Sequence, residues 1–386
     1  MLLTWVRWAV LAAAVFPSFY YLGVIIAARR FFNRPEQAPR DFTPPVSVLK
    51  PVQGLDLDAY ENYSSFCRQN YPQYEIVFGV SSEQDPAVPE IRKLIADFPQ
   101  IPIRLVVVRE GHGSNDKVSK LCGLAPAARY ELLIVSDGDI RVGPDYLRTV
   151  VAPFRGAQVG AVTSLYAGIP SRSLWSKLEA VNLSTDFMPS VLLARQVEGV
   201  RFALGATMAV RRKALEEIGG FEALADVAAD DHYLGRQIAA HGHQVELVDG
   251  TVKTMCSVKN RGEFFDHHLH WVVMGRQARP AGYFGYGFTL GLPWTILAVL
   301  LAPTWVVACG YVAAYLILRA GVAWTVGVRG LHDPLVKRQV WLVPLWDAFA
   351  FVFWLTSHFS NRIRWRGTEF SVARDRMIPT ATHDDR

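Results

Sequence analysis

YELLIVSDGDIRV, residues 130–142, joins an apolar run to two aspartates. The near-continuous Leu, Ile and Val content of residues 130–137 predicts a strand that is buried on both faces. Asp137 and Asp139 follow at the tip of this strand, and side chains two apart in an extended segment point to the same side. Two carboxylates placed in this way suit Mg²⁺ or Mn²⁺, with substrate phosphates in the open positions. A solvated acidic turn is the alternative interpretation.

Similar β-rich runs lie on either side of this stretch, and helical patterns separate them. The expected strands cover residues 45–51, 74–81, 103–108, 130–137 and 159–166. The expected helices cover residues 57–70, 86–98 and 117–128. This alternation predicts an α/β fold with a doubly wound, mostly parallel sheet. Ligands of such sheets bind beyond the carboxyl ends of the strands, so the residues at those ends are the candidates for function.

Further acidic residues lie at two other predicted element ends. Asp85 follows the strand expected at 74–81. Asp230 and Asp231 open the helical pattern AADDHYLGRQIAAHG, where one of them could simply be the N-cap. Gly205, in an otherwise apolar run, indicates either a close approach of the backbone to a ligand or a bulge.

A histidine cluster lies in FFDHHLHWVVMGRQARP, residues 264–280. His267, His268 and His270 could bind a metal, but their spacing is not that of HExxH. The segment leads directly into an apolar region, and Trp271 is typical of a membrane interface. An amphipathic helix at the interface is therefore the second interpretation.

Several functional classes are excluded by what the sequence lacks. It has no Walker A sequence, no GxGxxG after the first expected strand and no GxSxG elbow. A Walker-type nucleotidase and a dinucleotide oxidoreductase are therefore disfavoured. The net charge of +5 is not gathered in one long basic run, so nucleic acid is not an expected partner.

Apolar residues are concentrated at the two ends of the chain, which is 51% hydrophobic and only 19% charged overall. Residues 8–28 and 280–318 contain no charged side chain, and about 20 apolar residues suffice for a helix to cross a membrane. Residues 340–359 form a further apolar run, in which Asp347 is the only formal charge. This last run is expected to be re-entrant or interfacial, or to pair with another crossing.

The distribution of arginines predicts the orientation. Arg29, Arg30 and Arg34 follow the first apolar run, whereas Arg7 alone precedes it, which places the following domain in the cytoplasm. The expected parts are an N-terminal transmembrane helix (1–30), a cytoplasmic globular domain (45–279), a membrane module with two to four spans (280–366) and a polar tail (367–386).

The order of these features resembles the ceramide glucosyltransferase family of membrane glycosyltransferases, whose bacterial members include hopanoid-biosynthesis glycosyltransferases. The resemblance extends from the first apolar run to the WRG at 365–367, and it includes PVSVLKPVQG at 45–54 and NDKVSKL at 115–121. It implies a GT-A-like sheet that binds a nucleotide sugar.

The resemblance also implies roles for individual residues. Asp85 would contact the nucleoside, and Asp137 and Asp139 would share the metal and the diphosphate. Asp231 would be the general base, with Asp230 as its neighbour.

One segment departs from the family pattern. The family has Gln or Arg, two residues, then Arg-Trp, whereas this chain has His267, two residues, then His270 and Trp271. These three residues would bind the donor, although a histidine charge depends on pH because free His titrates near pH 6.5. Lys117 and Lys120 could instead supply permanent positive charge.

The function that the resemblance implies is an inverting membrane glycosyltransferase. It would move one sugar from a UDP-sugar to a hydroxyl of a membrane lipid of the ceramide or hopanoid type, with Mg²⁺ or Mn²⁺ as cofactor. The protein would be integral to a membrane, the bacterial inner membrane being expected. The alternatives are a processive polysaccharide synthase, a non-catalytic membrane scaffold and a transporter. The sugar, glucose or N-acetylglucosamine, and the acceptor lipid stay open.

Overall fold

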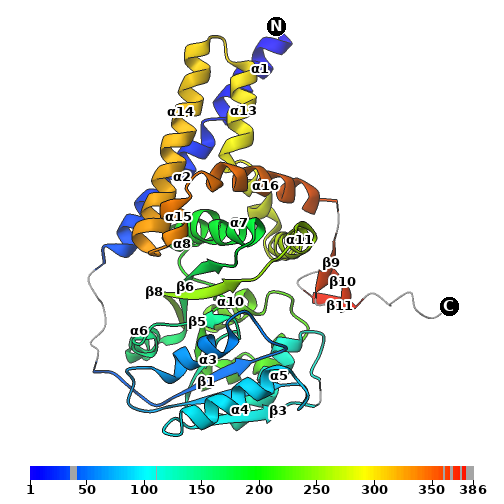
Figure 1. Ribbon diagram of the computed structural model, residues 1–386. Coiled ribbons are helices and arrows are strands. Elements are labelled where there is room, and N and C mark those ends of the chain that lie inside the picture. The colour runs from blue at the N-terminus through cyan, green and yellow to red at the C-terminus, as the bar shows by residue number, and fades with distance from the viewer. Residues whose placement is uncertain (35–40, 110, 360, 366–367, 374–375, 380–386) are drawn as a thin grey trace, which may run out of the picture.

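The computed structural model describes residues 1–34, 41–109, 111–359, 361–365, 368–373 and 376–379. A globular domain built on a β-sheet occupies the lower part of the molecule (Figure 1). A bundle of apolar helices from both ends of the chain stands above it.

One eight-stranded sheet organises the globular domain. In spatial order its strands are β3 (Ile103–Val107), β2 (Tyr74–Val80), β1 (Val46–Pro51), β4 (Leu132–Val135), β7 (Met208–Arg211), β6 (Val159–Pro170), β8 (Gln244–Cys256) and β5 (Ile140–Arg141). β3, β2, β1 and β4 run parallel, as do β6 and β8, whereas β7 and β5 run against their neighbours. The α/β class and the mostly parallel sheet are confirmed, and all five expected strands are present.

Alternate residues of the central strands belong to two hydrophobic cores, one on each face of the sheet. In β1, Val48 lies in one core and Leu49 in the other, and Ile76 and Val77 divide in the same way in β2. Every residue of β1, β2 and β4 is buried. The continuous apolar runs of the sequence therefore result from a sheet that is covered on both faces.

Helices provide that cover. In chain order they are α3 (Ala59–Cys67), α4 (Ala87–Asp97), α5 (Asp116–Ala127), α6 (Tyr146–Val151), α7 (Leu174–Asn182), α8 (Met188–Glu198), α9 (Arg212–Glu217), α10 (Asp230–Ala240) and α11 (Arg261–Ala278). The π-helical segment Leu183–Phe187 joins α7 to α8. α7, α8 and α11 lie between the sheet and the apolar bundle (Figure 1).

Two helices in the described part of the chain are long and apolar enough to cross a membrane. The first, Thr4–Phe32, combines α1 (Leu2–Ala13) and α2 (Phe16–Phe32). The second, Trp305–Gly330, combines α14 (Trp305–Val322) with the π-helical segment Ala323–Gly330. A third is possible if α12 (Pro280–Tyr286) and α13 (Gly291–Leu301), which are bent by 45°, form one span.

The last apolar run forms a shorter helix, α16 (Leu342–Ser357), which follows α15 (Pro334–Arg338). α16 lies across the domain-facing ends of the upright helices and contacts α7, α11 and α13 (Figure 1). Asp347 of α16 forms an ion pair with Arg319 of α14, with 2.6 Å between Oδ1 and Nη2. The charge that interrupts this run in the sequence is therefore neutralised between helices, as a buried carboxylate requires.

The hydrophobic core on one face of the sheet continues into the apolar bundle. The same cluster contains Val46 of β1, Phe31 of α2, Val322 of α14 and Phe353 of α16. The two parts separated at residues 279 and 280 in the sequence therefore pack as one body.

A small antiparallel sheet follows α16. It consists of β9 (Arg362–Trp365), β10 (Thr368–Ala373) and β11 (Arg376–Pro379). Backbone pairing of β9 with β10 joins the two sides of the boundary expected between 366 and 367. Phe370 packs against Val273 of α11 and against Ala228, which precedes the acidic start of α10. Arg366, at the end of the expected membrane module, and Gly367, residues 374–375 and residues 380–386 of the expected tail lie outside the described residues.

Candidate active site

The tip of β4 carries two of the predicted site residues. Because β1, β2 and β4 are parallel, their carboxyl ends lie at one edge of the sheet. Asp139 accepts a hydrogen bond from Thr254 Oγ1 of β8 (2.7 Å). Burial, together with the nearby Asp137, raises the pKa of Asp139 to about 7. Asp137 and Asp139 line two adjoining cavities, as the sequence predicted for a ligand site.

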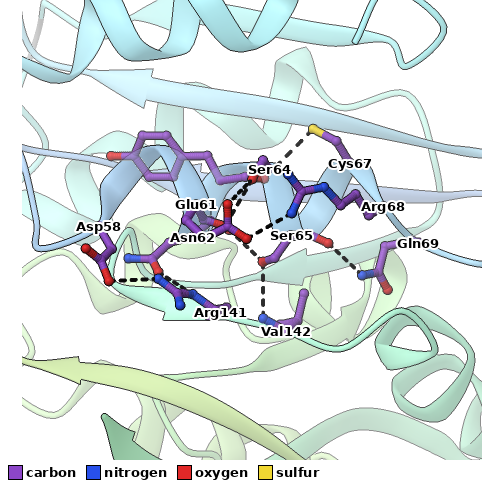
Figure 2. Close-up of polar contacts among 11 residues, drawn as sticks. Asp58, Glu61, Asn62, Ser64, Ser65, Cys67, Arg68, Gln69, Arg141 and Val142 are labelled. Carbon is purple, nitrogen blue, oxygen red and sulfur yellow. Dashed lines mark hydrogen bonds and ion pairs between the residues drawn. The ribbon is translucent and has the colours of Figure 1, made fainter. Parts of the chain in front are cut away.

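Helix α3 holds the segment that follows these aspartates (Figure 2). Arg141 donates to Asn62 Oδ1 and to Asp58 Oδ2, both at 3.1 Å. The backbone N–H of Val142 donates to Ser65 Oγ (3.1 Å). These contacts hold the residues that directly follow the SDGD turn.

A buried lysine also holds the backbone of the SDGD turn. Lys50, near the carboxyl end of the apolar strand β1, is fully buried and donates to the carbonyl oxygen of Asp137 (2.8 Å). Its ammonium group also lies 3.8 Å from the centre of the Phe66 ring, a cation–π contact. Burial lowers the pKa of Lys50 to about 7, although the neighbouring carboxylates oppose this shift.

Lys117 connects the β4 tip to the start of α10. The N-cap Asn115 starts α5 by accepting a hydrogen bond from Val118 N, which places Lys117 in the first turn. Its Nζ lies 2.8 Å from Asp137 Oδ1 and 3.7 Å from Asp230 Oδ2. Burial opposes the charge of Lys117, but these carboxylates outweigh it and raise its pKa. Lys117 is therefore a permanent cation at the centre of the site.

Asp230 and Asp231 begin α10 beside Lys117. Burial raises the pKa of Asp230 to about 6 and raises that of Asp231 too, while Lys117 lowers both. The Asp231 carboxylate accepts a hydrogen bond from the backbone N–H of His232 (2.7 Å). A Cβ placed on Gly205 would lie 3.4 Å from Asp231 Oδ2 and 3.7 Å from Asp137 Oδ2. The backbone of Gly205 thus lies beside the acidic groups of the site.

The histidines of α11 face the same region with different charges. His267 Nδ1 lies 2.9 Å from Glu179 Oε1; burial lowers the pKa of His267, but this contact outweighs it and raises the pKa overall. Burial, together with His267, lowers the pKa of His270 to about 4, so His270 is neutral at pH 7. His267 and Trp271 line both cavities, whereas His270 lines only the larger one. Of these two histidines, only His267 borders the smaller cavity, where it lies with Lys117 and Lys120.

Asp85 stands apart from this group. It accepts hydrogen bonds from the backbone N–H of Gly54 (3.0 Å) and of Ala87 (2.9 Å). It thereby ties the loop after β1 to the start of α4, and it does not line either cavity. The nucleoside contact of Asp85 stays a prediction.

The two cavities differ in size and lining. The small cavity, about 320 Å³, is bordered by the loop after β1 and by charged side chains that include Asp56, Lys120 and Glu179. The large cavity, about 620 Å³, extends from Asp231 to aromatic residues of α12 and α16, among them Tyr286 and Trp346. Lys117, Asp137, Asp139, Thr254, His267 and Trp271 line both. A polar compartment therefore meets an apolar one at the aspartates.

Three supporting residues were not predicted from the sequence: Lys50, Thr254 and Glu179. A lysine inside an apolar strand was the available signal for Lys50. Thr254 lies on β8, a strand that the sequence pattern did not predict, and Glu179 becomes significant only through its contact with His267.

Comparisons with known proteins agree with this arrangement. Ceramide glucosyltransferase 1 of Caenorhabditis elegans is 28% identical over 237 residues, which are 60% of this chain and 50% of that protein. Ceramide glucosyltransferase 3 of the same organism is 25% identical over 232 residues, with the same two shares. The chain thus spans about half the length of these relatives.

A solved structure shares the fold. The mannosyltransferase PcManGT from Pyrobaculum calidifontis, in complex with GDP-Man and Mn²⁺, superposes with a TM-score of 0.52 at 18% identity. The match covers 89% of this chain and 99% of that one. The GT-A-like fold is therefore confirmed.

A family model covers almost the whole chain. The model described as glycosyl transferase family 21 matches residues 6–378. The match confirms the resemblance drawn from the order of the motifs, and the chain belongs to glycosyl transferase family 21.

Proposed function

We propose that this protein is an inverting glycosyltransferase that moves one sugar from a UDP-sugar to a hydroxyl of a membrane lipid. The observation that carries the proposal is the meeting of the two cavities at the aspartates. The small one is lined by charged groups suited to a nucleoside diphosphate, and the large one reaches the apolar helices. A water-soluble donor and a lipid acceptor would meet where Asp137, Asp139 and Asp231 lie.

The donor diphosphate would occupy the small cavity. Lys117, His267 and Trp271 border it, while His270 would contribute a neutral imidazole from the large-cavity side. Asp85 would act through the loop after β1, since it holds Gly54.

The residues at the β4 tip fit a divalent cation. Asp137 and Asp139 present hard oxygen ligands to both cavities, and their mutual repulsion contributes to the raised pKa of Asp139. Among the described residues, no group of three or more His, Cys, Asp and Glu could hold a metal. Diphosphate oxygens and water would complete the coordination. A bound Mg²⁺ or Mn²⁺ would stabilise the charge that develops on the leaving diphosphate.

Asp231 would act as the general base. It would take the proton of the acceptor hydroxyl as that oxygen forms a bond to the anomeric carbon and the bond to the diphosphate breaks. A single displacement of this kind inverts the anomeric configuration. The raised pKa of Asp231 makes it a better base than a free aspartate, whose pKa is about 3.9.

The acceptor would enter the large cavity from the membrane. Ceramide and a hopanoid polyol both present hydroxyls on a bulky lipid, and the two curated relatives are named as ceramide glucosyltransferases. The chain would be anchored in the bacterial inner membrane with the sheet domain in the cytoplasm.

A polysaccharide synthase is the less favoured alternative. A polymer needs a continuous channel through the membrane, and the described residues provide two or three candidate spans. Single-sugar transfer fits the volume of about 620 Å³ of the large cavity, which lies within the ordinary range of small-molecule sites.

The test is incubation of the purified full chain with labelled UDP-glucose or UDP-N-acetylglucosamine and native lipid extract, followed by mass spectrometry. One sugar on a lipid, with inverted anomeric configuration, is the expected product. Asp231→Asn and Asp139→Asn should form this product far more slowly than the wild type. A long sugar polymer, or no lipid-linked product from either donor, would overturn the proposal.

A further inference from the structure

A carboxylate that the proposed chemistry does not use lies in the wall of the large cavity. Asp186 belongs to the π-helical segment Leu183–Phe187, between α7 and α8. Asn182 and Ser190, each four residues away, line the same cavity. Asp186 is hydrogen-bonded to Tyr286 of α12 and to Trp346 of α16, so it lies where the cavity meets the apolar helices.

The contacts of Asp186 hold one of its oxygens and leave the other available. Oδ2 accepts hydrogen bonds from Tyr286 Oη (2.6 Å) and from Trp346 Nε1 (3.0 Å). No described residue donates to Oδ1, and no described cation forms an ion pair with this carboxylate. The nearby Arg319 is already bound to both oxygens of Asp347. Two donors on one oxygen fix the orientation of the carboxylate and leave Oδ1 for an occupant of the cavity.

The surroundings restrict what that occupant can be. Val191, Ala350 and Phe353 line the same region, so the occupant is largely apolar there. A carboxylate in such surroundings is favourable only with hydrogen-bond donors or a cation. It attracts a hydroxyl or an amide N–H and repels a phosphate, which excludes an anionic phospholipid headgroup next to it.

We propose that Asp186 recognises a second hydrogen-bond donor on the lipid acceptor, a hydroxyl or an amide N–H close to the hydroxyl that receives the sugar. This rests on the proposed function and narrows its substrate class. Asp231 would activate one polar group of the acceptor, and Asp186 would hold another. Uncharged lipids with two neighbouring donors are then preferred over simple alcohols.

The test compares acceptors that differ by one donor. The full chain is assayed in nanodiscs with the UDP-sugar that it uses and with two pairs of acceptors. The first pair is 1-O-hexadecylglycerol and hexadecanol, and the second is N-octanoylsphingosine and its 3-deoxy analogue. In each pair the first acceptor has one more hydrogen-bond donor and is called the richer acceptor. Because a hydrogen bond to a charged group contributes about 1.5–3 kcal/mol, kcat/KM should favour the richer acceptor by roughly 10- to 100-fold. In Asp186→Ala this ratio should fall close to one, while turnover of the poorer acceptor and hydrolysis of the donor alone persist.

Ser190→Ala is the matched control, because Ser190 lines the same cavity but donates to Phe187 O (2.7 Å). It should keep the wild-type ratio. If Asp186→Ala does not accumulate, Asp186→Asn serves instead, and its ratio should fall at least severalfold.

Three results separate the possibilities. An equal fall of kcat/KM for both acceptors in the Asp186 variants would show that the residue is merely structural and would overturn the inference. Equal use of both acceptors by the wild type would also overturn it. Donor hydrolysis without any lipid product from the wild type would instead refute the proposed function.

Discussion

Asp231 is the residue on which the proposed chemistry depends most directly. Asp231→Asn keeps the shape of the side chain but removes its basicity, so kcat should fall by about 10²–10⁴-fold with little change in the KM for the donor. Asp230→Asn is the matched neighbour, and its smaller effect should appear mainly in donor binding, since Asp230 faces Lys117. Steady-state kinetics with both variants measure this difference. Near wild-type kcat in Asp231→Asn would remove the base assignment.

The acidic pair should also set the acid limb of the pH profile. The pKa of Asp230 is raised to about 6 and that of Asp231 is raised as well, and a base acts only when it is deprotonated. Activity should therefore be full above these pKa values and fall as the pH decreases through about 6. The two groups titrate as a pair, so the apparent midpoint belongs to the pair and not to either aspartate alone.

Lys117→Met tests the direction in which the pH midpoint of activity moves. Lys117 lowers the pKa of both aspartates, so its removal should move the midpoint of kcat/KM to higher pH. The position of the midpoint is the readout, because the overall rate will also fall when the lysine is lost. A midpoint that stays in place or moves to lower pH would contradict the electrostatic account.

At the scale of the residue, the sequence was sufficient where function follows from the end of an element. Asp137 and Asp139 follow β4, where the strand pattern predicted a ligand site, whereas Asp231, at the start of α10, was joined to them only by the family resemblance. Glu179 and Asp186 were not predicted, because their roles come from contacts with α11, α12 and α16 that no local pattern encodes. Asp85 is the converse case. It follows a strand, as a site residue would, but its observed contacts are to backbone N–H groups of the loop after β1 and of the start of α4.

At the scale of the element, α10 is placed by a close backbone contact. A Cβ on Gly235 would lie 2.3 Å from the carbonyl carbon of Phe202 and 2.4 Å from Ala203 N. Ala203 N in turn donates to Asp231 O (3.3 Å), so the same segment lies against the N-terminal end of the helix, which carries the proposed base. The glycine therefore sets how near α10 lies to the run that contains Gly205.

Gly235→Ala should push α10 away from this segment. Overpacking of this kind costs about 1–3 kcal/mol, so the thermal midpoint should fall, and kcat should fall with it because Asp231 moves. Gly143→Ala is the control, since nothing lies within 4 Å of a Cβ at Gly143. Differential scanning fluorimetry and initial rates measure both effects. Equal midpoints and rates in the two variants would show that α10 tolerates the added methyl group.

The strands that the sequence predicted are those with a regular pattern of buried residues. β1, β2 and β4 are buried throughout and were evident as apolar runs. β8 is long but only partly buried, with exposed and intermediate positions between buried ones, and its pattern did not indicate a strand. The small sheet of β9 to β11 follows the last apolar helix, and its pairing crosses the expected boundary: β9 was assigned to the membrane module and β10 and β11 to the polar tail.

At the scale of the whole molecule, the apolar bundle has a domain end and a distal end. Arg29 and Arg30 lie in the last turn of α2, at the domain end. Arg7 is at the distal end, where its Nε donates to Leu301 O at the end of α13 (2.7 Å). The one distal arginine is therefore used as a helix cap, and the remaining asymmetry follows the positive-inside rule. α16 lies across the bundle and is shorter than the helices that could cross a membrane (Figure 1).

This arrangement predicts the orientation of the chain in a bacterial membrane. In a Cys309→Ala background, whose other three cysteines are buried, Pro303→Cys marks the turn between α13 and α14 and Glu222→Cys marks the sheet domain. A membrane-impermeant maleimide should label Pro303→Cys in spheroplasts and Glu222→Cys only after permeabilisation. Each variant should first show wild-type activity, so that labelling reports the native fold. Labelling of Glu222→Cys alone before permeabilisation would place the sheet domain outside the cytoplasm, away from any UDP-sugar.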